Sequence, residues 1–168
     1  MQNSLLPVLI FMGDPIRSRF SEDEAGILDS LDVRNVYAAA KRAAENLCVC
    51  YGQRGSVCKI VRPGQIMGCG IALDDGRLHI DFISQILKSD KIVLKGDGTP
   101  VRTFIYMTDA IAGMLYVMSE GENAQAYNIC TEMGEASVLE LAQTMAGQVK
   151  GKSIQVDFNR ETRKTIRQ

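Results

Sequence analysis

Apolar and polar residues change their spacing several times along the chain, and this pattern predicts a series of strands and helices. Short apolar runs bounded by turn residues predict strands, namely 8–11, 56–61, 91–94, 102–107, 126–130 and 153–158. Alanine-rich or amphipathic stretches predict helices, namely 35–52, 78–88, 110–120 and 138–147. Because strands alternate with helices, we expect an α/β fold with some parallel pairing.

Several residues at the predicted helix ends have the chemistry of caps. Gly52 is placed to close the alanine-rich helix, and Ser137 to accept hydrogen bonds at the start of the last one. Thr108 or Asp109 is expected to cap the helix that follows residue 107. His79 is expected on the surface of its helix. The polar tail after residue 158 is not expected to contribute to the core.

The composition is that of an ordinary globular protein. The 168 residues are 46% hydrophobic and 23% charged, so we expect one domain over residues 1–168. Nineteen Lys and Arg against 20 Asp and Glu give a net charge of -1, which disfavours a nucleic-acid partner. The apolar stretch LLPVLIF is too short to span a bilayer and lacks the features of a signal peptide, so we expect no membrane contact and a cytoplasmic location.

The cysteines and the single histidine exclude some chemistries. The five cysteines are an odd number without C-x-x-C spacing, which favours reduced thiols over disulfides, and they are Cys48, Cys50, Cys58, Cys69 and Cys130. With His79 as the only histidine, nucleophilic triads and most zinc sites are disfavoured, and we expect no metal.

Tyr37 and Lys41 are the first candidate catalytic pair. They are four positions apart in the helix predicted over 35–52, hence on one face about one turn apart. An ammonium held near a phenol favours the phenolate, which can remove a hydroxyl proton while hydride leaves the same carbon. By itself the pair is a weak signal, and its spacing favours two polar neighbours with no catalytic role.

Further segments give this pair a context. In order along the chain these are FMGDP, NVYAAAKRAAE, KIVRPGQIMGCG, DDGRLHIDFISQIL, KGDGTPVRTFIYMTDAIAGM and AYNIC. Their order from about residue 11 to about residue 148 resembles the extended short-chain dehydrogenase/reductases, the NAD-dependent epimerases and dehydratases of nucleotide sugars. The resemblance is closest to the UDP-glucuronate decarboxylase and dTDP-glucose dehydratase branches. It implies the C-terminal part of an NAD(P)-binding Rossmann-like fold together with the small substrate-binding portion.

The resemblance implies a role for individual residues. Tyr37 matches the family's catalytic base, and Lys41 matches the lysine that assists the base and holds the nicotinamide ribose of NAD. Pro63 belongs to the loop whose backbone passes the nicotinamide, and Gln65 stands where an asparagine reaches the diphosphate of the substrate. Arg102 matches an arginine that binds this diphosphate, although an edge-strand arginine in solvent is the alternative.

The chain departs from the family pattern at three side chains and one motif. Asp81 replaces a substrate-binding asparagine, and a carboxylate there would repel a diphosphate unless it is turned away or paired. Val8 replaces a serine or threonine and Ile10 an acid, and neither can transfer a proton. No glycine-rich dinucleotide turn follows any predicted strand, so we expect the N-terminal NAD-binding half to be missing and NAD binding by this chain alone to be doubtful.

Three functions fit these observations. The first is a truncated epimerase/dehydratase family protein that is inactive alone. The second is an active epimerase, dehydratase or decarboxylase complemented in trans by an NAD-binding half. The third is a non-catalytic module that binds sugar nucleotides or pairs subunits. The substrate implied is a UDP- or dTDP-sugar, and a homo-oligomer is expected through the alanines of the helix over 35–52.

Overall fold

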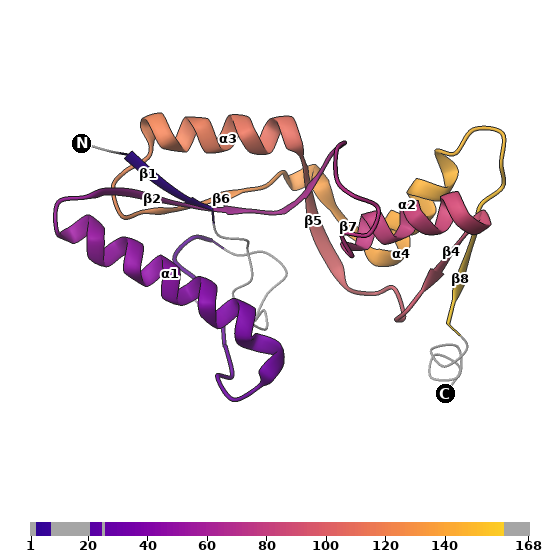
Figure 1. Cartoon of the computed structure of the whole chain (residues 1–168), viewed down its shortest axis with the longest axis horizontal. Coiled ribbons are helices and arrows are strands. Elements are labelled where there is room, and N and C mark those ends of the chain that lie inside the picture. Colours follow the sequence, from indigo (N-terminus) through magenta and orange to yellow (C-terminus); the bar gives the residue numbers. More distant parts are fainter. Residues whose placement is uncertain (1–2, 8–20, 25, 160–168) are drawn as a thin grey trace. The chain divides into compact units, whose positions relative to one another are not determined.

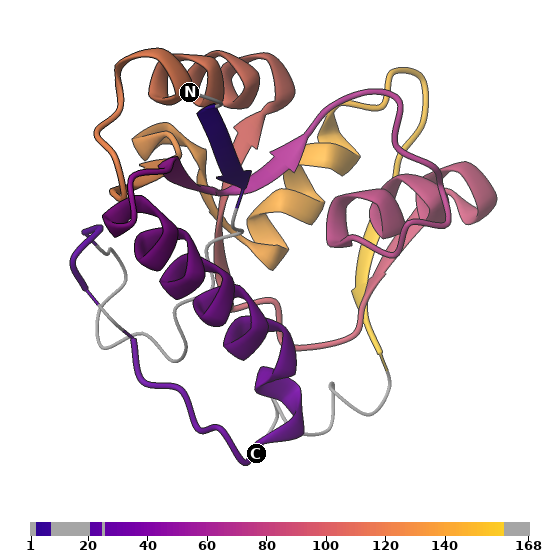
Figure 2. The same ribbon diagram turned by 60° about the vertical axis from the view of Figure 1, so that its left-hand side comes forward.

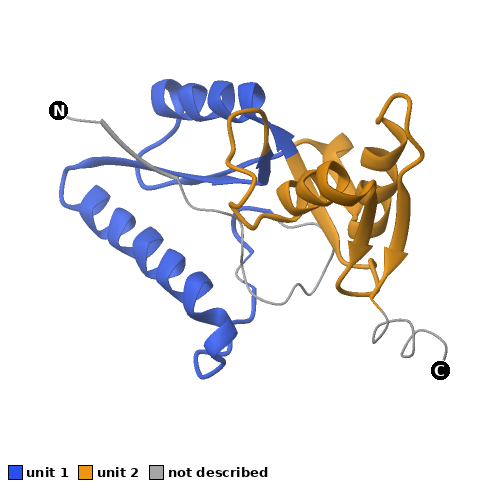
Figure 3. Cartoon of the chain, turned by 45° about the vertical axis from the view of Figure 1, so that its right-hand side comes forward, with its two compact units in different colours: residues 1–66, 105–130 blue, residues 67–104, 131–168 orange. Residues whose placement is uncertain are grey.

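A computed structural model describes residues 3–7, 21–24 and 26–159 of the chain. These residues form two compact units, drawn in blue and orange in Figure 3. Unit 1 contains the described residues up to 66 together with 105–130, and unit 2 contains 67–104 together with the described residues from 131 onward. The single domain expected over the chain stays a prediction.

Unit 1 is built on a three-stranded parallel sheet with the order β1-β2-β6. The strands are β1 (Asn3–Pro7), β2 (Val57–Pro63) and β6 (Ala126–Ile129). The helices α1 (Val36–Gln53) and α3 (Met107–Glu120) lie on opposite faces of this sheet (Figures 1 and 2). The predicted parallel pairing is therefore confirmed.

The two faces of this sheet carry separate hydrophobic clusters. Neighbouring residues of a strand point to opposite faces, and accordingly Ile60 packs with Cys48 of α1 while Val61 packs on the α3 side. The cluster on the α3 side is made by residues that are each at most 7% exposed, namely Val61, Ile105, Ala110, Val117 and Ile129. The helices are thus held on the sheet by apolar burial on both sides.

Unit 2 contains two helices and short strands. The helices are α2 (Leu78–Ser89) and α4 (Val138–Gly147). The strands β4 (Lys91–Leu94), β7 (Glu135–Ser137) and β8 (Gln155–Phe158) belong wholly to unit 2, whereas the residues of β3 (Gln65–Met67) and β5 (Val101–Tyr106) are divided between the two units. Strands β4 and β8 are parallel, β5 and β7 are antiparallel, and β3, β5 and β7 form one sheet. Two 3-10 turns, Val33–Asn35 and Glu132–Gly134, complete the elements of the described chain.

One apolar core stabilises unit 2. Its buried members are Phe82, Ile92, Leu94, Phe104, Leu141, Ala142 and Ala146. The predicted N-cap at Ser137 is confirmed, because its side chain accepts a hydrogen bond from Glu140 N and the Glu140 carboxylate accepts one from Ser137 N. This capping box satisfies two backbone donors that the start of α4 would otherwise leave without partners.

Gly52 does not have the predicted role of closing helix α1. Helix α1 continues to Gln53 and its C-cap is Arg54, so Gly52 is a buried residue of the last turn. A Cβ at Gly52 would lie 2.8 Å from the Cβ of Ala124, which is closer than two carbons can pack. The glycine is thus required for close contact between the helix and the segment before β6. Ala38, one of the alanines of this helix, is buried at 1% exposure.

Two further expectations about helices were wrong. Helix α3 begins at Met107 with Tyr106 as its N-cap, so Thr108 and Asp109 lie inside the first turn. His79 is not on the surface, because only 2% of it is exposed. The loop to which Pro63 was expected to belong is instead the end of β2, and the short strand β3 follows it.

No helix among the described residues combines the length and the apolar content that a membrane span needs. The strand end predicted over residues 8–11 and most of the polar tail fall outside the described residues.

Candidate functional site

Tyr37 and Lys41 lie on the first turns of α1, as their spacing predicts. A short 3-10 turn precedes the helix, and it is capped by Asp32, whose carboxylate accepts a hydrogen bond from Arg34 N at 2.9 Å. The Lys41 Nζ lies 5.6 Å from the centroid of the Tyr37 ring, within the range of a cation–π contact. Tyr37 is 49% exposed, so the pair can be reached by a ligand.

The start of α1 lies near the carboxyl ends of the parallel strands. A helix that connects two parallel strands runs back across the sheet, so its first turn lies at the end where the preceding strand finishes. Figure 1 shows this arrangement for α1, β1 and β2. In open α/β sheets this end is where ligands bind. Tyr37 and Lys41 are therefore in the part of unit 1 where a substrate site is expected.

A buried ion pair that sequence reasoning missed fixes α1 on the sheet. Arg62 of β2 donates from Nε and Nη2 to the two carboxylate oxygens of Glu45, both at 2.7 Å. Its Nη1 donates to the Glu22 carbonyl at 2.9 Å. The side chains of Arg62 and Glu45 are only 8% and 14% exposed. Because Glu45 follows Lys41 by one helical turn, this contact holds the helix that carries the candidate pair.

Pro63 and Gln65 follow this arginine at the end of β2. Pro63 is buried and opposite Ile129 of β6, and the next residue, Gly64, donates its N–H to the Ile129 carbonyl at 2.9 Å. Gln65 is half-buried and begins β3. Both residues are thus at the carboxyl end of a parallel strand, as a ligand-binding loop of this fold requires.

Asp81 of unit 2 is a paired carboxylate. Its Oδ2 lies 3.2 Å from the Nζ of Lys95, the residue directly after β4, and accepts a hydrogen bond from Gln85 Nε2 at 3.3 Å. Gln85 is in turn fixed by the N–H of Val93, which donates to its Oε1 at 2.8 Å. The sequence alone left open whether this carboxylate is turned away or paired, and the structure supplies the partner.

Arg102 lies exposed on β5. Its backbone is opposite Ala136 of β7, and its Nη1 donates to the Val101 carbonyl at 3.0 Å. The guanidinium has four further N–H donors, and such a planar group suits a phosphate or carboxylate ligand. Its role as a ligand for a diphosphate stays a prediction.

The candidate residues are distributed over both units. Unit 1 carries Tyr37, Lys41, Pro63 and Gln65, and unit 2 carries Asp81 and Arg102. Val8 and Ile10, where the resemblance predicts the loss of a hydroxyl and an acid, lie outside the described residues. Within 3–7, 21–24 and 26–159, no group of three or more His, Cys, Asp or Glu side chains is arranged to hold a metal ion.

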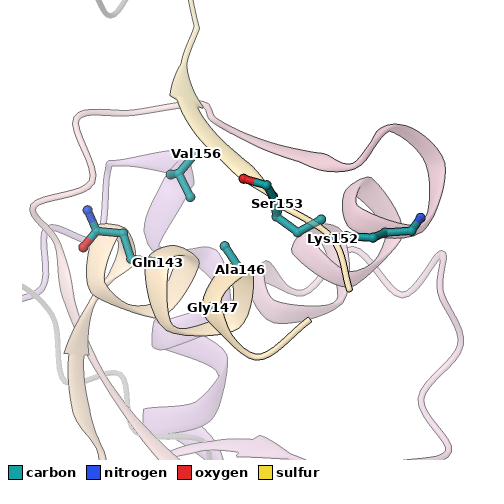
Figure 4. Close-up of a pocket in the computed structure, with 7 residues that line it drawn as sticks. Gln143, Ala146, Gly147, Lys152, Ser153 and Val156 are labelled. Carbon is teal, nitrogen blue, oxygen red and sulfur yellow. The ribbon is translucent and has the colours of Figure 1, made fainter. Parts of the chain in front are cut away.

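A hollow of about 420 Å³ in unit 2 does not include any of these residues. Its lining comes from α4, from the segment before β8 and from β8 itself (Figure 4), namely Gln143, Ala146, Gly147, Lys152, Ser153, Ile154 and Val156. The Lys152 ammonium is paired with Asp90 at 2.7 Å. None of the candidate site residues predicted from the sequence therefore lines this hollow.

Comparison with known proteins decides the family. Residues 13–130 match the NAD dependent epimerase/dehydratase family, and this segment is more than half of the chain. The chain belongs to this family. The matched segment contains α1 with Tyr37 and Lys41, and strand β2 with Arg62. It also contains Asp81, Lys95 and Arg102.

Curated relatives and solved structures agree with this assignment. The chain is 32% identical over 134 residues to UDP-glucuronic acid decarboxylase 4 of Arabidopsis thaliana, covering 79% of this chain and 30% of the relative. It is 33% identical over 139 residues to UDP-glucuronic acid decarboxylase 6 of the same plant, covering 82% and 40% respectively. The chain therefore spans less than half the length of these relatives.

Among solved structures, the fold resembles dTDP-glucose 4,6-dehydratase from Bacillus anthracis, which was solved in complex with NAD. The TM-score is 0.74 at 20% identity, with 94% of this chain and 50% of the other covered. RMD from Pseudomonas aeruginosa, complexed with NADPH, gives a TM-score of 0.64 at 26% identity, covering 93% and 53%. The α/β fold with parallel strands is thus that of about half of a Rossmann-like enzyme chain.

Proposed function

We propose that this chain supplies the proton-transfer helix and the sugar-nucleotide-binding portion of an NAD-dependent enzyme that acts on UDP- or dTDP-sugars. The observation that carries the proposal is the pairing of Tyr37 with Lys41 at the accessible start of α1, inside the segment that matches the family. The decarboxylase names of the curated relatives support a nucleotide sugar as the substrate.

The chemistry assigned to this chain is the movement of one proton. The Tyr37 oxygen takes the proton of a sugar hydroxyl, and the Lys41 ammonium stabilises the negative charge on the phenolate. NAD, when bound, accepts the hydride that leaves the same carbon. Arg102 binds the diphosphate of a sugar nucleotide through its fork of donors.

The residues of this chain fit only one end of NAD. Exposed Tyr37 and the adjacent Lys41 would hold the nicotinamide ribose, and the backbone at Pro63, at the end of β2, would form part of the nicotinamide site. The 168-residue sequence contains no glycine-rich turn of the kind that receives the pyrophosphate at a helix N-terminus. We therefore assign the pyrophosphate site to an NAD-binding half that residues 1–168 do not contain.

It follows that residues 1–168 alone are inactive, and that activity returns when an NAD-binding half is present. The side chains of Val8 and Ile10 have no proton to give, so Tyr37 is the proton-transfer group that this proposal assigns to the chain. The alternative is a module that binds sugar nucleotides or pairs subunits without catalysis.

Calorimetric titration of the purified chain tests this proposal. We expect UDP-glucose or dTDP-glucose to bind measurably, and NAD to bind weakly or not at all. Arg102→Met should weaken sugar-nucleotide binding, whereas Arg54→Met, which removes an exposed arginine of unit 1, should not. NAD binding in the low micromolar range would contradict the assignment of its site to a second half, and no binding of any nucleotide sugar would contradict the proposed substrate class.

An apolar stripe on α1 supports self-association as part of this proposal. We define the α1 stripe as Val36, Ala40, Ala43, Leu47 and Tyr51, whose spacing places them on one face of the helix. Val36, Leu47 and Tyr51 are 73%, 58% and 57% exposed, and two small alanines lie between them. Two copies of this helix can approach closely because the alanines leave little bulk.

Sedimentation velocity tests self-association through the α1 stripe. Wild type is expected to form a dimer or larger oligomer, and Leu47→Glu is expected to be monomeric because it places a charge in the contact. Leu87→Glu changes a leucine of α2 that is 66% exposed and serves as the control. A monomeric wild type at high micromolar concentration would contradict the oligomer.

A further inference from the structure

Two cysteines meet at the contact between α1 and β2. Cys48 is a buried residue of α1, and it packs with Ile60 of β2. Cys58 comes two residues before Ile60 on the same strand, is half-buried, and packs against this cluster. Because residues two apart on a strand share a face of the sheet, Cys58 and Ile60 both face α1. The two thiols therefore come from different elements and share one cluster.

A bridging asparagine fixes the end of α1 beside the start of β2. The Asn123 side chain accepts a hydrogen bond from Cys58 N at 2.8 Å and donates one to the Gly52 carbonyl at 3.2 Å. The backbone of Cys58 and the last turn of α1 are thus tied to the same side chain. Cys48 precedes Gly52 by one helical turn, so both residues lie on the face of α1 that this contact holds against the strand.

The two thiols differ in how a reagent can reach them. Burial raises the pKa of the Cys48 thiol to about 11, with smaller effects from the charge and the hydrogen bonding of the Cys58 thiol. Cys48 therefore stays protonated near neutral pH and does not start a reaction, since the thiolate is the nucleophile. Cys58 is half-buried, so a small reagent can reach its sulfur. An oxidised Cys58 then has the Cys48 thiol beside it as a partner for a disulfide.

We propose that Cys48 and Cys58 are a modification site, where hydrogen peroxide converts the two thiols into a reversible disulfide. The Cys58 thiolate attacks one peroxide oxygen, the O–O bond breaks, and the departing hydroxide takes up a proton to become water. The Cys48 sulfur then attacks the sulfur of the sulfenic acid formed at Cys58. The S–O bond breaks, and a second water leaves with the Cys48 proton. The two thiols lose two electrons in total, and the peroxide gains them.

The resulting bond joins α1 to β2 across the turn between them. The two sulfurs of a disulfide are about 2 Å apart. Because the thiols already pack in one cluster, rotation of their side chains brings the sulfurs to this distance. The bond holds the last turns of the helix that carries Tyr37 and Lys41 against β2. No nucleotide takes part in this step, so the proposed function can fail without affecting it.

Peptide mapping by mass spectrometry after treatment of the full chain with an equimolar amount of hydrogen peroxide tests this site. Wild type is expected to lose two of its five thiols and to give a disulfide within one chain between the Cys48 and Cys58 peptides. Trypsin separates these peptides because it cleaves after Arg54. Dithiothreitol should restore both thiols.

A triple variant removes the competing thiols. Cys50 shares its tryptic peptide with Cys48, so wild type alone does not distinguish these two cysteines. The variant Cys50→Ser/Cys69→Ser/Cys130→Ser replaces the three exposed cysteines and should form the same disulfide within one chain. Cys48→Ala keeps Cys58 without its partner, so Cys58 should stop at the sulfenic acid, which dimedone traps.

The triple variant decides the matter even if Cys48→Ala does not fold, because it keeps both thiols of the pair. A disulfide between Cys48 and Cys58 within one chain that dithiothreitol reverses supports the modification site. A disulfide that joins two chains, oxidation of Cys58 while the Cys48 thiol stays intact, or two thiols that peroxide leaves unchanged would each overturn it.

Discussion

The buried pair between Arg62 and Glu45 gives the strongest test of how α1 is held in place. Glu45→Ala removes both oxygens that Arg62 contacts at 2.7 Å and leaves a guanidinium that is 8% exposed with the Glu22 carbonyl as its remaining acceptor. Removal of one partner from a buried ion pair costs about 3–5 kcal/mol, because the other charge stays buried without compensation. The remaining carbonyl contact places our expectation near 3 kcal/mol, at the lower end of this range.

Urea denaturation followed by circular dichroism measures this loss as a shift of the unfolding midpoint. Lys152→Ala is the matched control, because it breaks a pair with Asp90 of the same 2.7 Å length in which both side chains are more than half exposed. The control should lose less than about 1 kcal/mol. The double variant Arg62→Met/Glu45→Met removes both charges and should be more stable than Glu45→Ala. A loss for Glu45→Ala no larger than that of the control would refute the reasoning.

Three further predictions concern packing, thiol reactivity and pH. Gly52→Ala should destabilise the chain by about 1–2 kcal/mol in urea denaturation, because the new Cβ would lie 2.8 Å from the Cβ of Ala124. Gly147→Ala, whose Cβ would meet nothing within 4 Å, should be neutral or stabilising. Equal effects of the two substitutions would exclude the packing explanation. Burial, with a smaller effect from the thiol of Cys58, raises the pKa of Cys48 to about 11. A maleimide at pH 8 should therefore label Cys48 about a hundredfold more slowly than exposed Cys50, as measured by peptide mass spectrometry. Similar labelling rates for the two cysteines would contradict this prediction. Burial lowers the pKa of His79, so the folded state favours the neutral ring and should lose stability as pH falls below about 6.5, by up to about 1.4 kcal/mol per pH unit. Denaturation at several pH values should show that the free energy of unfolding depends less steeply on pH in His79→Leu. An unchanged pH dependence in this variant would exclude His79 as the cause.

The elements of the fold could be predicted where the signal is local. The alanine-rich segment forms α1 within one residue of its predicted start, and Ser137 with Glu140 forms a capping box, since both depend on residues within a turn of each other. Gly52 was misassigned because a glycine near a helix end has the same local sequence whether it caps the helix or packs closely against another segment. Only the fold shows that Ala124 lies against it.

The candidate site was predicted in the same uneven way. The spacing of Tyr37 and Lys41 implied their contact, because residues four apart on a helix are neighbours. The Arg62–Glu45 and Asp81–Lys95 pairs join residues 17 and 14 positions apart on different elements, so no periodicity reveals them. An arginine inside an apolar strand did indicate that some acceptor must be buried with it, and that signal could have been used.

Turnover by the complemented protein tests the central claim most directly. The chain is mixed with a separately expressed NAD-binding half of a family member, and conversion of UDP-glucuronate, UDP-glucose and dTDP-glucose is followed by chromatography. We expect conversion of one of these sugars by wild type, background rates for the chain alone, and a loss of at least about a hundredfold for Tyr37→Phe, as expected for removal of a general base. Tyr51→Phe, which changes another exposed tyrosine of α1, should stay active. Equal rates for Tyr37→Phe and wild type, or no conversion by the complemented wild type, would contradict the account.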